Sequence, residues 1–362
     1  MNFNKKTVAL IFGGRGHEHS VSLSGAEYML TLIDPASCCV LPVLITRDGE
    51  WRIQNATRHG TYADFRSLCD ALSDPLRSSS VAPIYSGGRS GFLTDGGELI
   101  PVDVAFPLLH GDGGEDGCVQ GALECARIPY VGCGVTASAL SLDKAYTKTV
   151  AEHEGIPTAK WTIAVNGSTH HSLERAIATA EQSFGYPMFV KAAGLGSSVG
   201  VYRVEDRDEL ITAYRDAVSL GSERVLIEEA LDVASELECA VLLTEHRNIY
   251  SDLSEIRCDG GYYTYERKYS GGGVTVTPRA EISGEVRNAV RKYTEILSDA
   301  LGTRHLSRFD FFLTADGRLI FNEVNTLPGF TPTSMYAHLI EDAGVPPREL
   351  VRELVEDAVR EP

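Results

Sequence analysis

The residues best suited to chemistry lie near the carboxyl end, in the segment RFDFFLTADGRLIFNEVN that begins at Arg308. The dipeptide DG at 316–317 separates two runs of alternating apolar residues, which predicts a hairpin with a two-residue turn. Counting outward from that turn places Asp310 opposite Glu323. The same register places Arg308 opposite Asn325. Like charges that face each other across a ladder repel, so the pairing of two carboxylates requires a reason.

A divalent cation held between the two carboxylates would remove this repulsion. Mg²⁺ takes oxygen ligands and completes its octahedron with water and substrate phosphates, which fits Asp310, Glu323 and the amide oxygen of Asn325. Two ions bridged by Glu323 would clamp the terminal phosphates of a nucleotide. Arg308 could then hold the oxygens of the transferred group. The alternative is the solvated face of a two-stranded ribbon, but the apolar residues between these positions already supply the buried side.

A glycine-rich segment, FVKAAGLGSSVGVYRV, provides a candidate phosphate loop. Its glycines allow backbone N–H groups to turn toward a ligand, and Ser197 and Ser198 add hydroxyl donors beside Lys191. The segment is not a P-loop, because it lacks GxxxxGK[ST] and a strand follows it. A second cation, Lys144 in LSLDKAYTK, lies at the start of an expected helix. Considered separately, an ordinary Gly-Ser turn and a solvated helix lysine are the favoured explanations of these residues.

The composition is typical of a globular protein of more than one domain. The chain has 362 residues, of which 43% are hydrophobic and 23% charged, and a formal net charge of −17. This charge argues against nucleic acid or an anionic membrane as the main partner. The eight cysteines form no CxxC pair, which favours free thiols in a reducing, cytoplasmic setting. No apolar run approaches the length of a membrane span.

The elements that must position these residues alternate between strand and helix, which predicts an α/β fold with a parallel sheet. TVALIF is an expected strand followed by the glycine loop GGRGHEHSVS and a helix, and PVDVAFPLLHG is another strand. Residues 52–98 are polar, and we interpret them as a variable excursion from the alternating strands and helices. A second unit begins near the helical pattern ASALSLDKAYTKTVAEHEG. A third unit contains the hairpin and ends in two helices.

Taken together, the ordered motifs resemble those of D-alanine–D-alanine ligases, which belong to the ATP-grasp superfamily. The motifs are IFGGRGHEHSVS, LHGDGGEDGCVQG, GIPYVGCGVTASALSLDK, VKAAGLGSSVGV, YERKYS and RFDFFLTADGRLIFNEVNTLPGFTPTSMY. The resemblance spans nearly the whole chain except residues 52–98. It implies three consecutive α/β domains, at 1–132, 133–227 and 228–362, with ATP held between the second and the third. It also implies a homodimer formed through the first domain, which binds the first substrate.

The resemblance implies a definite reaction. ATP phosphorylates the carboxylate of one D-alanine, the amine of a second D-alanine attacks the acyl phosphate, and phosphate leaves. Two Mg²⁺ ions, for which Mn²⁺ could substitute, would accompany ATP. Such a cytoplasmic enzyme supplies D-alanyl-D-alanine for peptidoglycan synthesis, and its partners are the small molecules D-alanine and ATP.

Roles at individual positions also follow from the resemblance. Contacts to ATP are implied for Lys144, Lys191, Ser198, Glu228, Leu231, Glu236 and Lys268. Catalytic contacts are implied for Glu18, His110, Ser197, Tyr269, Arg308 and the backbone N–H of Gly329. The second substrate would lie against Ser334 and Met335, and the metal ions against Asp310, Glu323 and Asn325. Two departures from the family pattern are Gly16, where serine is common, and Ala192, where proline is usual.

A hydrogen-bonded trio of Glu18, Ser197 and Tyr269 would tie a lid to the first substrate. The segment DGGYYTYERKYSGGG, glycine-rich at both ends, has the composition of such a lid. Without the resemblance, Glu18 could be a loop acid and His110 could simply end a strand.

The second substrate is predicted to be D-alanine. The lid pair Lys268 and Tyr269, which D-lactate-type relatives lack, is present, and SMY stands where D-serine ligases often have SRY. A D-alanine–D-serine ligase remains the alternative, because a pocket for a methyl group rejects an added hydroxyl only weakly.

Overall fold

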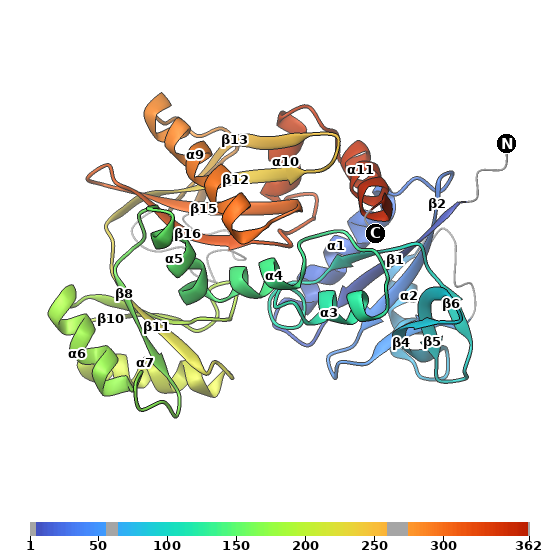
Figure 1. Cartoon of the computed structure of the whole chain (residues 1–362), viewed down its shortest axis with the longest axis horizontal. Helices are drawn as coiled ribbons and strands as arrows, with labels where there is room; N and C mark the ends of the chain where they lie inside the picture. The colour runs from blue at the N-terminus through green and yellow to red at the C-terminus, as the bar shows by residue number, and fades with distance from the viewer. Residues whose placement is uncertain (1–4, 56–63, 259–273, 361–362) are drawn as a thin grey trace.

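The computed structural model describes residues 5–55, 64–258 and 274–360. Three sheets carry the strands in this part of the chain (Figure 1). The first has seven strands in the order β6-β5-β4-β3-β2-β1-β7, the second four in the order β10-β9-β11-β8, and the third five in the order β14-β13-β12-β15-β16. No helix among the described residues is long and apolar enough to cross a membrane.

The first sheet is parallel only at one end. There β1 (Lys6–Gly13) lies between β2 (Cys38–Ile45) and β7 (Val104–Leu108), parallel to both. The parallel sheet expected from the sequence is confirmed for these three strands. Four further strands are added antiparallel, namely β3 (Trp51–Gln54), β4 (Ser78–Ser86), β5 (Arg89–Thr94) and β6 (Leu99–Pro101). Of these strands, β4 and β5 lie within the polar excursion at 52–98, and β3 and β6 lie at its two ends.

Helices flank this sheet, and the loops that follow two of its parallel strands lie at the same edge. The helices are α1 (His19–Leu32), α2 (Phe65–Ser73) and α3 (Cys118–Cys125). Because β1 and β7 run parallel, the loops that follow their carboxyl ends meet at the same edge. One loop carries Glu18 and the other carries His110.

The second sheet is antiparallel throughout. Its strands are β8 (Trp161–Val165), β9 (Met188–Ala192), β10 (Val201–Val204) and β11 (Arg224–Glu229). Two helices, α6 (Leu173–Ser183) and α7 (Arg207–Ser219), pack against it through a shared apolar core. The connection from the first sheet contains α4 (Val135–Leu142) and α5 (Lys144–His153).

The third sheet carries the hairpin. Its strands are β12 (Val233–Leu243), β13 (Asn248–Cys258), β14 (Val274–Thr277), β15 (His305–Thr314) and β16 (Leu319–Asn325). The accompanying helices are α9 (Gly284–Leu301), α10 (Met335–Asp342) and α11 (Pro347–Arg360). One core joins this unit to the first sheet, since Leu10, Phe106, Leu242, Tyr336 and Leu354 belong to the same buried cluster.

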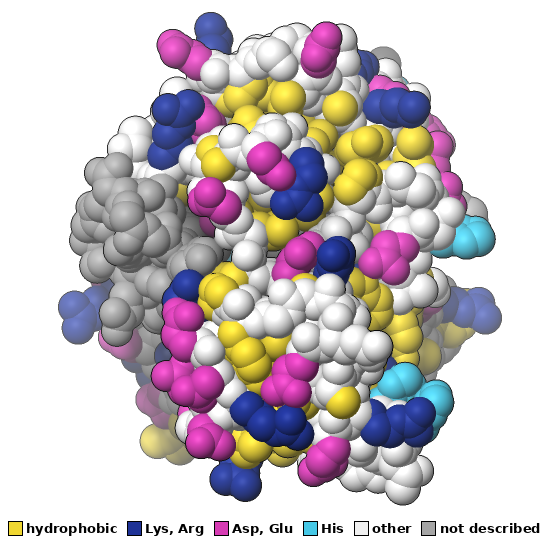
Figure 2. Space-filling model, turned by 90° about the vertical axis from the view of Figure 1, so that its left-hand side faces the viewer, with side chains coloured by type: hydrophobic (Ala, Val, Ile, Leu, Met, Phe, Trp, Pro, Cys, Tyr) yellow, Lys and Arg dark blue, Asp and Glu magenta, His cyan; other side chains and the backbone are white. Residues whose placement is uncertain are grey.

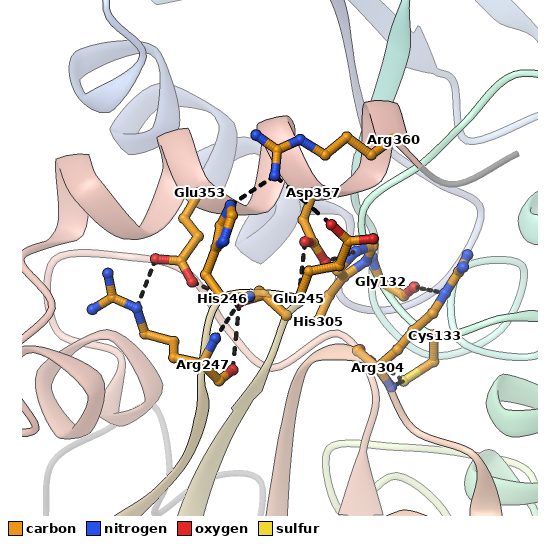
Figure 3. A network of polar contacts seen from close by, with 11 residues as sticks. Gly132, Cys133, Glu245, His246, Arg247, Arg304, His305, Glu353, Asp357 and Arg360 are labelled. Carbon is orange, nitrogen blue, oxygen red and sulfur yellow. Dashed lines mark hydrogen bonds and ion pairs between the residues drawn. The ribbon is translucent and has the colours of Figure 1, made fainter.

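A polar network fixes α11 between the two units (Figure 3). The backbone N–H of Gly132 donates to Nδ1 of His305 at 2.9 Å, and Nε2 of His305 lies 3.4 Å from Asp357 on α11. Arg304 donates to the carbonyl of Gly132 at 2.9 Å. Glu353 forms an ion pair with Arg247, whose Nε lies 3.0 Å from a carboxylate oxygen of Glu353. The start of β15 is therefore tied both to α11 and to the segment that leaves the first sheet.

The hairpin register at the acidic pair is confirmed, but the two-residue turn is wrong. Thr314 pairs with Arg318 around a three-residue loop that ends in Gly317 at φ 83°, a form with a type I turn and a left-handed residue. A one-residue irregularity between positions 310 and 311 of β15 then restores the expected pairing. Asp310 consequently faces Glu323.

Charged side chains of both signs are interspersed on the end of the molecule formed by the second and third sheets. Figure 2 shows Lys and Arg beside Asp and Glu across this face, with apolar side chains between them. Neither sign forms a continuous field on the described part of that face.

Candidate active site

A cavity of ≈ 470 Å³ lies between the second and third sheets, within the range of small-molecule sites. Its polar wall includes Lys144, Lys191, Ser198, Glu228, Glu236 and Glu323. Its apolar wall includes Ala159, Phe189, Val201, Leu231, Ile256 and Phe312. Apolar side chains beside cations and carboxylates are suited to an aromatic ring joined to a charged tail.

The candidate phosphate loop leaves β9 and has a strained backbone. Ser197 and Ser198 have φ values of 51° and 58°, a left-handed conformation that is uncommon for residues with a Cβ and that clusters at functional sites. Lys144 supports the loop, because its Nζ donates to the carbonyl of Leu195 at 2.9 Å. The same ammonium lies 3.2 Å from Glu323. Lys144 therefore bridges the loop and the hairpin.

A buried ion cluster forms the floor of the cavity. Glu228 on β11 forms ion pairs with Lys148 at 2.7 Å and with Lys191. Burial favours the neutral acid, but the two ammonium groups outweigh it and lower the pKa of Glu228 to about 2. Lys191 also lies over the ring of Phe189, 5.7 Å from its centroid. Glu228 is thus a charged anchor for the lysine that lines the cavity.

Carboxylates crowd the neighbouring hairpin. Arg308 holds Asp310 through two hydrogen bonds of 2.7 Å, and its Nε also lies 3.2 Å from Glu238. Burial, reinforced by the neighbouring carboxylates and opposed by Arg308, raises the pKa of Asp310 to about 6. Burial, together with Asp310 and Glu323, raises the pKa of Glu236 to about 8. Arg308 therefore pairs with Asp310 and Glu238, Lys144 pairs with Glu323, and the carboxylates of the cluster are only partly neutralised.

The oxygen ligands at the hairpin fit a magnesium ion that a nucleotide helps to bind. Within the described ranges, no three His, Cys, Asp or Glu side chains form a ready metal cage. Mg²⁺ seldom uses such a cage and relies on one or two carboxylates plus phosphate oxygens and water. Asp310 and Glu323 supply these carboxylates, and Asn325, which donates to Asp310 at 3.0 Å, adds an amide. Because Asp310 faces both Glu323 and Glu238, a bound cation would lower the repulsion among these carboxylates.

Glu18 joins the first sheet to the phosphate loop. Its Oε1 accepts a hydrogen bond from Ser197. Its Oε2 lies between Gly111 and Gly196, where an added Cβ would approach it at 3.2 and 3.3 Å. Two glycines therefore leave room for this carboxylate, which lies at the start of α1.

His110 and Glu115 connect the loop after β7 to the loop after the hairpin. Nδ1 of His110 lies 3.0 Å from the carbonyl oxygen of Leu327. Glu115 accepts backbone N–H groups from Gly111 and Leu327, both at 2.9 Å. Burial raises the pKa of Glu115, although His110 and these backbone donors oppose it. Glu115 was missed from the sequence, although it stands in the quoted GGEDG segment.

The loop before α10 is tightly packed. Oγ of Ser334 accepts from the N–H of Thr331 at 2.9 Å. A Cβ on Gly329 would lie only 3.0 Å from that hydroxyl, so the position favours glycine. Met335 begins α10 and packs against the core shared with the first sheet.

Most predicted site residues line the cavity or lie in the loops around it. Lys268 and Tyr269 lie outside the described residues. Sequence reasoning also missed Lys148, which lies one helical turn after Lys144 on α5, and Glu238, which faces Asp310 only once β12 pairs with β15. The apolar wall of the cavity was missed too, because such residues look like ordinary core.

Comparisons with known proteins cover nearly the whole chain. Residues 7–133 match the family model "D-ala D-ala ligase N-terminus", and residues 150–356 match "D-ala D-ala ligase C-terminus". The D-alanine–D-alanine ligase of Ruminiclostridium cellulolyticum is 38% identical, over 98% of this chain and 95% of that protein.

Solved structures of similar overall shape include two ligases. The VanG D-Ala:D-Ser ligase from Enterococcus faecalis has a TM-score of 0.85 at 31% identity, covering 98% of this chain and 100% of that one. The D-alanine–D-alanine ligase from Coxiella burnetii has a TM-score of 0.82 at 26% identity, covering 98% and 94%.

Proposed function

The chain belongs to the D-alanine–D-alanine ligase family, and on that premise we propose how its residues perform the ligation. The enzyme is an ATP-dependent carboxylate–amine ligase that joins two D-alanine molecules for peptidoglycan precursor synthesis. The first D-alanine is activated as an acyl phosphate, and the amine of the second displaces phosphate from it. Each step needs groups that hold negative charge and exclude water.

The observation that carries the proposal is the cavity between the second and third sheets. It places two lysines and a hairpin carboxylate around one space, beside apolar side chains. Phe189 and Leu231 would contact the adenine, and Lys144 and Lys191 would hold the polyphosphate. Glu236 is near enough to the same wall to accept from a ribose hydroxyl. Lys268 completes the set of ATP contacts in the proposal.

Magnesium is the proposed cofactor, with two ions held by Asp310, Glu323 and Asn325, and Mn²⁺ as a substitute. A bound dication lowers the repulsion between the nucleotide and these carboxylates and polarises the phosphoryl group. Arg308 lies beside Asp310 and can direct its remaining N–H donors to the oxygens of the reacting group. Ser198 supplies a further donor in the phosphate loop.

The first D-alanine is proposed to lie between the first sheet and the phosphate loop. Glu18 would receive its ammonium group, and the hydrogen bond from Ser197 keeps that carboxylate in place. His110 would lie beside the acyl phosphate. In the proposal Tyr269 joins Glu18 and Ser197 when a lid closes over the site, which keeps the acyl phosphate away from water.

The second D-alanine is proposed to lie against the loop before α10. Ser334 would hold its carboxylate, and the backbone N–H of Gly329 would join Arg308 in stabilising the oxyanion. Met335 would present an apolar surface to the methyl group. The backbone of Gly329 lies close to Ser334, since an added Cβ would approach the Ser334 hydroxyl at 3.0 Å, and this proximity supports the assignment.

The division into domains at 1–132, 133–227 and 228–362 is part of the proposal, and the three sheets support it. A homodimer formed through the first domain is also proposed on the family resemblance. A cytoplasmic location is supported by the free cysteines among the described residues.

The decisive assay measures ADP release with Mg²⁺-ATP and D-alanine, followed by mass identification of the product. The similarity to a D-Ala:D-Ser ligase makes D-serine the necessary comparison, and D-lactate a second one. D-Alanine alone should give ADP and D-alanyl-D-alanine. ADP release that requires D-serine would support the D-alanine–D-serine ligase, and no release with any of them would refute the proposal.

A further inference from the structure

Lys148 is a buried cation that the proposed chemistry does not use. It lies one helical turn after Lys144 on α5, on the face that also buries Ala145 and Ala151. Its exposed fraction is 1%, and no other lysine among the described residues is buried to this degree. Burial lowers the pKa of its ammonium group, and Glu228 opposes that effect.

Lys148 stands behind the wall of the nucleotide cavity. Glu228 and Lys191 line the cavity, whereas Lys148 is not part of its wall. The three side chains form a row in which Glu228 gives one carboxylate oxygen to Lys148, at 2.7 Å, and the other to Lys191. Lys148 can therefore act on a ligand only through its neighbours.

Stability alone gives no reason for a lysine at this position. A buried ion pair is often no more stable than apolar residues of the same volume, because both charges lose hydration. Glu228 already has a partner in Lys191, so a neutral residue at position 148 would leave one balanced pair. The additional ammonium changes the charge of the row from zero to +1.

We propose that Lys148 is a positioning residue for the nucleotide. Lys148 binds one carboxylate oxygen of Glu228, so that Lys191 keeps net positive charge for the polyphosphate. With Lys148 present, Glu228 divides its oxygens between two ammonium groups. With Lys148 removed, both oxygens and the full negative charge of Glu228 act on Lys191. The ammonium of Lys191 is then drawn to Glu228 and neutralised. This inference rests on the proposed function, because it assumes that the cavity binds ATP.

The first test replaces Lys148 with methionine, which has nearly the same length and no charge. Binding of Mg²⁺-ADP to Lys148→Met should weaken about tenfold in calorimetry, and KM for ATP should rise while KM for D-alanine stays near the wild-type value. Lys148→Arg should recover part of the affinity. Lys292→Met, at an exposed position on α9, controls for the loss of one positive charge.

The second test removes the anion. In a Glu228→Gln background the row has no negative charge to neutralise Lys191, so Lys148→Met should cause no further loss of nucleotide affinity. If Lys148 only supported the fold, Lys148→Met would weaken nucleotide binding equally in the wild-type and Glu228→Gln backgrounds. That result would overturn the inference. Unchanged ADP affinity in Lys148→Met would overturn it too. Wild-type ADP release with D-alanine, measured alongside, separates this failure from failure of the proposed function.

Discussion

The carboxylate side chains at this site are only partly neutralised by the cations beside them. Glu323 lies 3.2 Å from Lys144, and Asp310 takes both hydrogen bonds from Arg308. Glu236 is left among like charges, and its pKa is raised to about 8. An arrangement of this kind binds a cation and an anionic substrate together better than either one alone.

Replacing Glu323 with glutamine should lower kcat at least about 100-fold, because an amide is a weak ligand for a divalent ion. The shape is nearly unchanged, so the urea-unfolding midpoint should stay close to that of the wild type. Asp316→Asn is the matched control, since Asp316 is an exposed carboxylate on the turn of the same hairpin. Ordinary turnover by Glu323→Gln at low Mg²⁺ would exclude Glu323 as a metal ligand.

Removing the hydroxyl of Ser197 should raise KM for D-alanine about tenfold, because Glu18 loses the donor that holds its carboxylate. Initial rates of ADP release at varied D-alanine provide the measurement. Ser219→Ala, at an exposed helix position, should behave as the wild type. If both variants show the same KM, the contact between the loop and the first sheet has no part in substrate binding.

At the scale of elements, the hairpin shows what could be predicted and what could not. Alternating apolar residues on both sides of DG identified the strands, and the pairing of Asp310 with Glu323 is correct. The turn was predicted with two residues and has three, and the irregularity in the ladder compensates for the difference. A bulge has no strong local sequence pattern, because it depends on the twist and packing of the completed sheet.

Gly317 tests the three-residue turn. It has φ 83° and no atom within 4 Å of an added Cβ, so only backbone strain opposes a side chain. Gly317→Ala should lower the free energy of unfolding by about 1 kcal/mol, and Gly317→Asn by less, because asparagine tolerates the left-handed region. Gly284→Ala on α9, also without contacts but without positive φ, should be neutral or stabilising. Equal effects of alanine at both positions would contradict the turn geometry.

At the scale of the whole molecule, the sequence predicted the order of the parts better than the contacts between them. The residues within a motif such as GLGSSVG or NEVN are neighbours in the chain, so the local geometry of each motif follows from glycine and alternation. The row Lys148–Glu228–Lys191 and the bridge from Glu115 to Leu327 join segments far apart. Their burial depends on how whole sheets pack. The strands β4 and β5 in the polar stretch at 52–98 were not predicted, because partly exposed antiparallel strands resemble loops in composition.

His305 makes the stability of the assembled units depend on pH. Burial, reinforced by Arg304 and opposed by Asp357, lowers its pKa to about 4, against about 6.5 in an unfolded chain. The unfolded chain therefore takes up a proton that the folded protein excludes. The contribution of His305 is present above pH 6.5 and is lost as the pH falls toward 4, by up to about 3 kcal/mol.

Urea unfolding between pH 7 and pH 5 measures this contribution. The His305→Asn variant tolerates the φ of 58° at this position and has no ring to titrate, so its stability should fall less steeply with pH. It should be less stable than the wild type at pH 7, because Gly132 and Asp357 lose their partner. Parallel pH profiles for the two proteins would show that His305 does not carry the effect.

The most direct measurement of the central claim follows the carboxylate oxygens of D-alanine. With D-alanine labelled by ¹⁸O in both carboxylate positions, attack on the γ-phosphorus and later loss of phosphate must carry one labelled oxygen into each inorganic phosphate released. Mass spectrometry should therefore find phosphate with one ¹⁸O, and D-alanyl-D-alanine that retains three. Phosphate without label, formed at the same rate as ADP, would mean that the enzyme hydrolyses ATP without activating the D-alanine carboxylate, and would contradict the account.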